Sequence, residues 1–193
     1  MHGLMNRAIQ GFLRDTYGED LWARIARTAR LHPDGFEAML HYDDAQTETV
    51  LGTAAQQLDR ARDSILEDVG TWLVSSSAGQ PLRRLLRFGG VSFTDFLHSL
   101  EELRGRGRLA LPDLGLPVLT LHEPQPGVYD LTCQGLPGFG AVLMGVLRGM
   151  ADDYGALVLL DHAGLRDGAE TLRIQLLAAD FAEGRRFDLA GEG

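Results

Sequence analysis

The sequence predicts an α+β domain in which N-terminal helices precede a four-stranded antiparallel sheet with further helices beside it. Two observations carry this prediction. Through most of residues 1–110, apolar residues recur at the three-and-four spacing of helices that bury one face. Further on, four short segments alternate apolar and polar residues and form two hairpins across loops rich in glycine or proline; they are residues 117–122, 128–133, 156–161 and 171–178.

Capping and turn residues set the expected bounds of the helices. The first helix should end at Tyr17-Gly18, and Asp59 or Asp63 should cap the fourth. Pro81 suits the first turn of a short helix, whose three arginines (Arg83, Arg84 and Arg87) should lie on its outer face. The other expected helices cover residues 19–31, 42–58 and 138–154. About seven helices are therefore expected in all.

The central helix is the segment around which the chain is organised. Its buried stripe should consist of five large apolar residues, namely Phe93, Phe96, Leu97, Leu100 and Leu103. Ser92 is the expected N-cap, and Gly105 and Gly107 should end the helix. Arg104 directly follows the last stripe residue. Its side chain is therefore a candidate to project into any cavity that the stripe lines.

Composition narrows the possible functions. The 193 residues are 45% hydrophobic, which is enough for one core, and we expect a single domain over residues 1–182. Within it, a helical lobe should cover about residues 1–60 and a ligand-pocket lobe about 61–182, with a polar tail at 183–193. We expect a cytoplasmic protein, because no apolar run approaches a membrane span and the first residues lack the pattern of a signal peptide.

Charge and cysteine content exclude several classes of partner and site. A net charge of −9 argues against nucleic acid as a partner, even though Arg104, Arg106 and Arg108 form a short basic run. The single cysteine, Cys133, cannot form an internal disulfide, and its place in an alternating segment indicates a buried strand thiol. Catalytic signatures such as a nucleophile elbow, a His-Glu-x-x-His pair or a phosphate loop are missing from the sequence, so an enzyme is not expected.

Several motifs in a fixed order resemble a known family nearly end to end. They are Met1-His-Gly-Leu-Met-Asn-Arg-Ala, Tyr17-Gly-Glu-Asp-Leu-Trp22, Phe96-Leu-x-x-Leu-x-x-Leu103, Pro112-Asp-Leu with Pro117 after it, and the glycine-rich segment from Gly138 to Gly155. This arrangement is similar to that of the heme nitric oxide/oxygen-binding (H-NOX, or HNOB) domains, which are sensors and are found in bacteria. The resemblance implies the α+β H-NOX fold.

The same resemblance implies that the heme chemistry of the family has been lost here. In the family, a histidine that ligates heme iron follows the last leucine of the central helix, and in this chain Arg104 stands there. A guanidinium stays protonated and offers no lone pair to a metal. The nearest histidine, His98, lies roughly 120° around the helix. The family's Tyr-x-Ser-x-Arg propionate clamp is also missing, since Thr132, Gln134 and Leu136 occupy its positions. We therefore expect a divergent, heme-free member.

Related folds bind apolar ligands, which suggests what could fill the cavity. The resemblance implies a pocket for a fatty acid or similar lipid, with Arg104 pairing with the carboxylate; the lining residues would be Met5, Ile9, Leu100, Leu103, Pro117, Leu143 and Leu147. Alternatively, Arg104 faces solvent and the cavity has collapsed into core.

Three functions therefore compete. The leading one is a non-catalytic sensor that acts in trans on a diguanylate cyclase, a phosphodiesterase or a histidine kinase. The second is a heme-based nitric oxide sensor that uses His98, His2 or His122 as its iron ligand. The third is a purely structural interaction protein.

Overall fold

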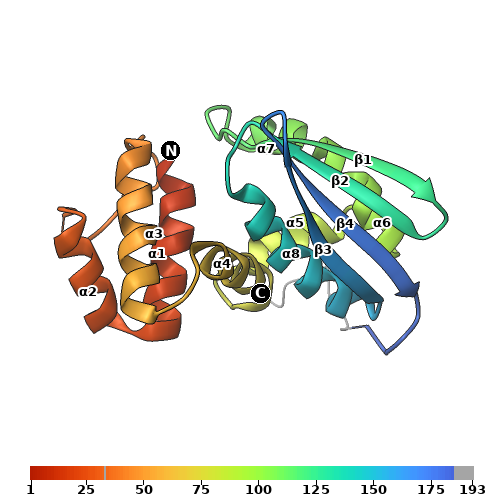
Figure 1. Cartoon of the computed structure of the whole chain (residues 1–193), viewed down its shortest axis with the longest axis horizontal. Coiled ribbons are helices and arrows are strands. Elements are labelled where there is room, and N and C mark those ends of the chain that lie inside the picture. The colour runs from red at the N-terminus through yellow and green to blue at the C-terminus, as the bar shows by residue number, and fades with distance from the viewer. Residues whose placement is uncertain (33, 185–193) are drawn as a thin grey trace, which may run out of the picture.

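The computed structural model describes residues 1–32 and 34–184, which form helices on one side and a helix-covered sheet on the other (Figure 1). In chain order, the elements are α1 (Gly3–Tyr17), α2 (Glu19–Thr28), α3 (Asp44–Leu58), α4 (Arg62–Ser75), α5 (Gln80–Arg87), α6 (Phe93–Ser99), the 3₁₀ turn η1 (Leu100–Glu102), α7 (Leu103–Ala110), β1 (Val118–Gln125), β2 (Val128–Gln134), α8 (Phe139–Tyr154), β3 (Leu157–Arg166) and β4 (Ala169–Ala178). The predicted α+β class is confirmed.

The four strands form one antiparallel sheet in the order β1-β2-β4-β3. Both predicted hairpins are present, and β4 of the second pairs with β2 of the first, with Leu172 opposite Leu131. Side chains that alternate along each strand divide the sheet into two faces. The inner face packs on α8 and on the α6–η1 segment, where Leu131, Leu172 and Ile174 are fully buried. This places one large core directly behind the central helix.

A second core occupies the N-terminal half. Its aromatic and aliphatic side chains come from α1, α2, α3 and one face of α4, and Trp22 and Ile25 on α2 are almost completely buried. The amphipathic spacing along α1 and α2 therefore predicted their inner faces well. None of the described helices is both long enough and apolar enough to cross a lipid bilayer.

Two glycines let α4 and α8 approach each other at backbone distance. A Cβ built on Gly70 of α4 would collide with the carbonyl oxygen of Val142 in α8, and one built on Gly145 of α8 would collide with the carbonyl oxygen of Glu67 in α4. Such close packing is possible only without side chains at these positions. Since α4 also contributes to the N-terminal core, this contact fixes the two cores relative to each other (Figure 1).

The central helix departs from its predicted course. Ser92 is the N-cap of α6, as expected, but a 3₁₀ turn follows and α7 then runs on through Gly105 and Gly107. The predicted stop at these glycines is wrong, since the helix passes through both of them, with Gly107 buried beside the Leu116 side chain. The helix ends at Ala110, and its C-cap, Leu111, is extended because it precedes Pro112.

Two further sequence predictions are corrected by the structure. The N-cap of α4 is Ala61, which supplies no side-chain cap, whereas Asp59 is the left-handed C-cap of α3 and Asp63 lies in the first turn of α4. Aspartate tolerates the left-handed backbone at position 59 better than most residues do, and the carboxylate of Asp63 is favoured by the positive end of α4. In α5, Arg83 points inward, where its guanidinium pairs with the buried Asp153 of α8.

We predict that Gly70→Ala destabilises the protein by about 2–3 kcal/mol, because a methyl group forces α4 away from α8. The matched control is Gly52→Ala in α3, where an added Cβ meets nothing within 4 Å. This control should raise stability by up to about 1 kcal/mol through helix propensity. Urea unfolding followed by circular dichroism measures both changes. Equal stability of the two variants would contradict the backbone contact.

Candidate ligand site

Four of the residues predicted to line a pocket lie together in the larger core. Leu100 of η1, Leu103 at the start of α7, and Leu143 and Leu147 of α8 are members of one buried hydrophobic cluster. Leu103 is 9% exposed and the other three are at 2% or less. The apolar stripe of the central helix is therefore buried, as its spacing predicts.

The remaining predicted pocket residues lie elsewhere. Ile9 belongs to the N-terminal core, and Met5, one turn earlier on α1, is half-buried. Pro117 is buried just before β1. The structure therefore divides the predicted set between two cores that meet along α4, and a shared lining remains a prediction.

Arg104 lies at the outer edge of the leucine cluster. It is the second residue of α7 and its side chain is exposed, whereas Leu103 directly before it is buried. Arg106, two residues on, bends back and donates a hydrogen bond to the carbonyl oxygen of Ser99 at 2.7 Å. The guanidinium of Arg104 is therefore exposed to solvent, although the residue directly follows a buried residue of the apolar core.

All six histidines lie within the described residues, and five of them are exposed. The buried one, His2, is the N-cap of α1, where its Nδ1 accepts a hydrogen bond from the Leu4 amide at 3.1 Å. His98 points out from α6 with its ring 6.3 Å from that of Tyr129. The others are His32, His41, His122 and His162. Among the described residues no three His, Cys, Asp or Glu side chains are grouped so as to hold a metal ion.

A buried carboxylate, not suggested as a functional group by the sequence analysis, lies at the N-terminus of α8. Glu170 of β4 is 8% exposed, and its Oε1 accepts a hydrogen bond from the Gly138 amide at 2.7 Å. Its Oε2 lies 3.2 Å from Nε2 of His162 on β3. The positive end of a helix dipole favours this charge. The alternation of buried residues along β4 could have predicted that Glu170 faces inward, because Glu170 lies two residues before the buried Leu172 and four before the buried Ile174.

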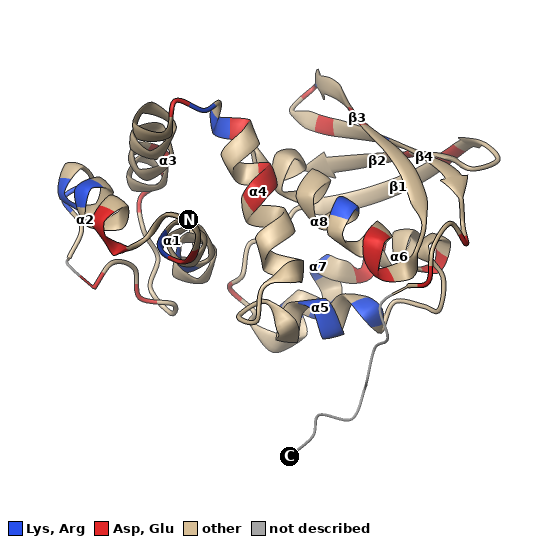
Figure 2. Cartoon of the chain, turned by 90° about the horizontal axis from the view of Figure 1, so that it is seen from below, with Lys and Arg blue, Asp and Glu red and all other residues tan. Residues whose placement is uncertain are grey.

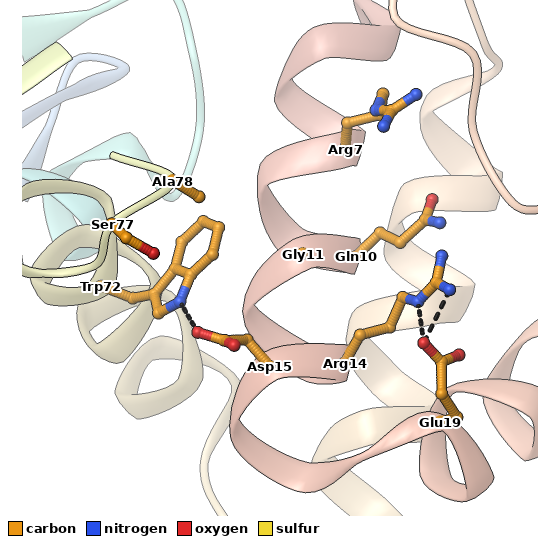
Figure 3. A pocket seen from close by; sticks show the side chains of 9 residues that line it. All are labelled: Arg7, Gln10, Gly11, Arg14, Asp15, Glu19, Trp72, Ser77 and Ala78. Atoms are coloured by element: carbon orange, nitrogen blue, oxygen red, sulfur yellow. Dashed lines mark hydrogen bonds and ion pairs between the residues drawn. The ribbon is translucent and has the colours of Figure 1, made fainter. Parts of the chain in front are cut away.

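Two shallow hollows lie on the surface of the described residues, and neither is lined by a predicted pocket residue. One, of about 400 Å³, lies between α1 and the end of α4 with the loop that follows (Figure 3). Its polar groups largely satisfy one another, because Asp15 accepts a hydrogen bond from the Trp72 indole at 2.7 Å and Arg14 pairs with Glu19. The other, of about 300 Å³, lies on the outer sheet face around Arg173.

The family model described as Haem-NO-binding matches residues 2–162. Among curated proteins, soluble guanylate cyclase 89Db of Drosophila melanogaster is 20% identical over 155 residues, which are 80% of this chain and 23% of the cyclase. Soluble guanylate cyclase gcy-31 of Caenorhabditis elegans is 21% identical over 154 residues, or 79% of this chain and 22% of that protein. The chain thus spans about a quarter of the length of these relatives.

Solved structures show the same fold. An H-NOX protein from S. oneidensis in the Fe(II) ligation state, carrying three substitutions, has a TM-score of 0.78 at 15% identity, covering 93% of this chain and 97% of that one. An oxygen-binding H-NOX domain related to soluble guanylate cyclases, in its oxygen complex, has a TM-score of 0.73 at 16% identity, covering 96% and 100%. The predicted fold family is therefore confirmed.

We predict that Cys133 is inert in the folded protein. Burial raises the pKa of its thiol to about 12, and the nearby Glu170 carboxylate acts in the same direction. At pH 8 the reactive thiolate is therefore scarce, and the side chain is 2% exposed. Ellman's reagent should label this residue only after unfolding in urea, at the rate of an ordinary thiol. Complete labelling of the native protein within minutes would contradict the assigned burial.

Proposed function

Since the chain belongs to the Haem-NO-binding (H-NOX) family, we propose that it is a ligand-responsive sensor domain that works without heme and acts on a partner protein. The observation that carries the proposal is Arg104. By the resemblance stated above, this residue stands where the family has its iron-ligating histidine, and its side chain is an exposed guanidinium. A cation without a lone pair cannot ligate iron and would repel it.

The N-terminus of α8 supports the proposal independently. The family's clamp for the heme propionates would lie on the segment that leads into this helix, where the chain has Thr132, Gln134 and Leu136. The Gly138 amide at the helix start is already bound by the Glu170 carboxylate. A propionate brought to this end would meet a like charge in a partly buried environment, which raises the free energy of binding.

An apolar small molecule, such as a fatty acid, is the ligand class that suits the remaining residues. Leu100, Leu103, Leu143 and Leu147 belong to one buried apolar cluster, to which the central helix, α8 and the sheet all contribute. An acyl chain would enter by displacing side chains of this cluster, while Arg104 at its edge pairs with the carboxylate. Ligand entry would then move the central helix. The partner would be a diguanylate cyclase, a phosphodiesterase or a histidine kinase.

Heme-based nitric oxide sensing is the second candidate function. The family match supports it, because the matching model carries the description Haem-NO-binding and one similar structure is of an iron-ligated protein. In this chain the iron ligand would have to be His98, His2 or His122. Of these, His98 and His122 are exposed and His2 caps α1, so an imidazole could reach the interior only after local rearrangement.

A hemin titration separates these two functions. We expect the parent protein to show no Soret band that saturates at one heme per chain, because no imidazole is directed into the core. Arg104→His is the matched variant, since it places an imidazole at the position of the family's ligand. A saturating band in the parent that disappears in His98→Ala, His2→Ala or His122→Ala would instead establish the heme sensor and identify its ligand.

The fatty-acid anchor is tested with a fluorescent acyl probe. We expect Arg104→Ala to weaken binding about tenfold, which corresponds to the loss of one charge-assisted hydrogen bond. Arg108→Ala, at an exposed position later in the same helix, is the control and should bind as the parent does. Equal affinities of the parent and the Arg104 variant would refute the anchor.

A further inference from the structure

One face of α5 is apolar and exposed. Pro81, Arg84, Leu85 and Phe88 are spaced so that they share a side of this helix, and all four are exposed. Phe88 is 72% exposed, and Val91 in the following turn is 94% exposed. Large apolar side chains that gather on the surface of a folded domain are typical of protein interaction sites. We call Arg84, Leu85, Phe88 and Val91 the α5 surface.

The opposite face of α5 is firmly attached to the domain. The buried Arg83 guanidinium pairs with Asp153 near the end of α8, with Nη2 and Oδ1 2.9 Å apart. Arg87 stacks over the Tyr154 ring, 3.8 Å from its centroid, and the Tyr154 hydroxyl donates to the Gly90 carbonyl at 3.1 Å. The exposure of Leu85 and Phe88 is therefore set by the orientation of a fixed helix.

The charge of this region is opposite to that of the whole protein. The chain has 27 acidic residues and a net charge of −9, yet no acidic residue lies between Asp68 and Asp95, a stretch that holds three arginines. Figure 2 shows basic residues in blue along α5; of the three, Arg83 is buried and paired with Asp153, so the outer positive charge comes from Arg84 and from Arg87 beside the Tyr154 ring. The next carboxylate along the chain, that of Asp95, is engaged by the Ser92 amide at 3.0 Å. Arg84 remains exposed at the surface.

The position of α5 links it to both parts of the candidate site. It follows α4, which packs against α8 through Gly70, and it precedes the central helix, which carries Leu100, Leu103 and Arg104. A movement of the central helix relative to α8 would therefore be transmitted to the loop that contains Val91. A partner bound here would sense such a movement.

We propose that the α5 surface is the docking site for an acidic, amphipathic helix of the signalling partner. This inference rests on the proposed function, because it names the surface through which that function would act. Leu85, Phe88 and Val91 would take the apolar side chains of the partner helix, and Arg84 its carboxylates. Aromatic and arginine side chains contribute most to such interfaces.

The test uses two labelled peptides with the same leucine face, one bearing glutamates on its polar face and the other lysines. Fluorescence anisotropy measures their binding to the full chain. We expect the acidic peptide to bind at least tenfold more tightly than the basic one. Phe88→Ala should weaken acidic-peptide binding at least tenfold, and Arg84→Glu should abolish the preference for the acidic peptide. The matched control is Leu165→Ala in β3, an exposed leucine in a distant part of the fold, which should change nothing.

Several results would overturn this inference. They are equal binding of both peptides, unchanged binding by Phe88→Ala, and an equal loss in the Leu165 control. Sedimentation showing a dimer that Phe88→Asp dissociates would assign the surface to a second copy, and Phe88-dependent binding to anionic phospholipid vesicles would assign it to a membrane. Since no heme or fatty acid is added, failure here leaves the hemin and acyl-probe results unaffected.

Discussion

The close contact between α4 and α8 is the constraint on which the rest of the structure depends. Gly70 and Gly145 bring the two backbones together, so that one helix belongs to the N-terminal core while the other supports the sheet. The N-terminus of α8 then lies beside Glu170, and its C-terminal end holds α5 through Asp153. The apolar stripe of the central helix belongs to the same hydrophobic cluster as the leucines of α8. Any ligand of the larger core would therefore have to enter between side chains of the central helix, α8 and the sheet.

In the proposed heme-free function, the demands of the fold and the demands of iron binding fall on different residues. The fold needs the apolar stripe of the central helix, because Leu100 and Leu103 complete the core. It does not need an imidazole after that stripe, since Arg104 is solvated there without disturbing the packing. The helix dipole of α8, which favours a negative charge at its start, obtains one from Glu170.

The α+β class could be predicted from the sequence because apolar residues recur with the period at which side chains are buried. This holds for the stripe of the central helix and for the paired strands. Sequence reasoning failed where tertiary contacts override local signals. Gly105 and Gly107 indicate a helix end by propensity, but the segment stays helical through both, with Gly107 buried beside Leu116. Arg83 was expected on the outer face of α5. Its buried partner, Asp153, lies on α8, and the spacing of residues within α5 gives no sign of this tertiary contact. Of the candidate site, the four leucines could be predicted from spacing, whereas the division between two cores could not.

The most direct test of the central claim is a native mass spectrum of the protein purified from heme-replete cells, because it reports every bound small molecule at once. We predict the mass of the chain alone, or that mass with an acyl-chain increment. An increment of one heme per chain would contradict it and would require a replacement iron ligand among the six histidines.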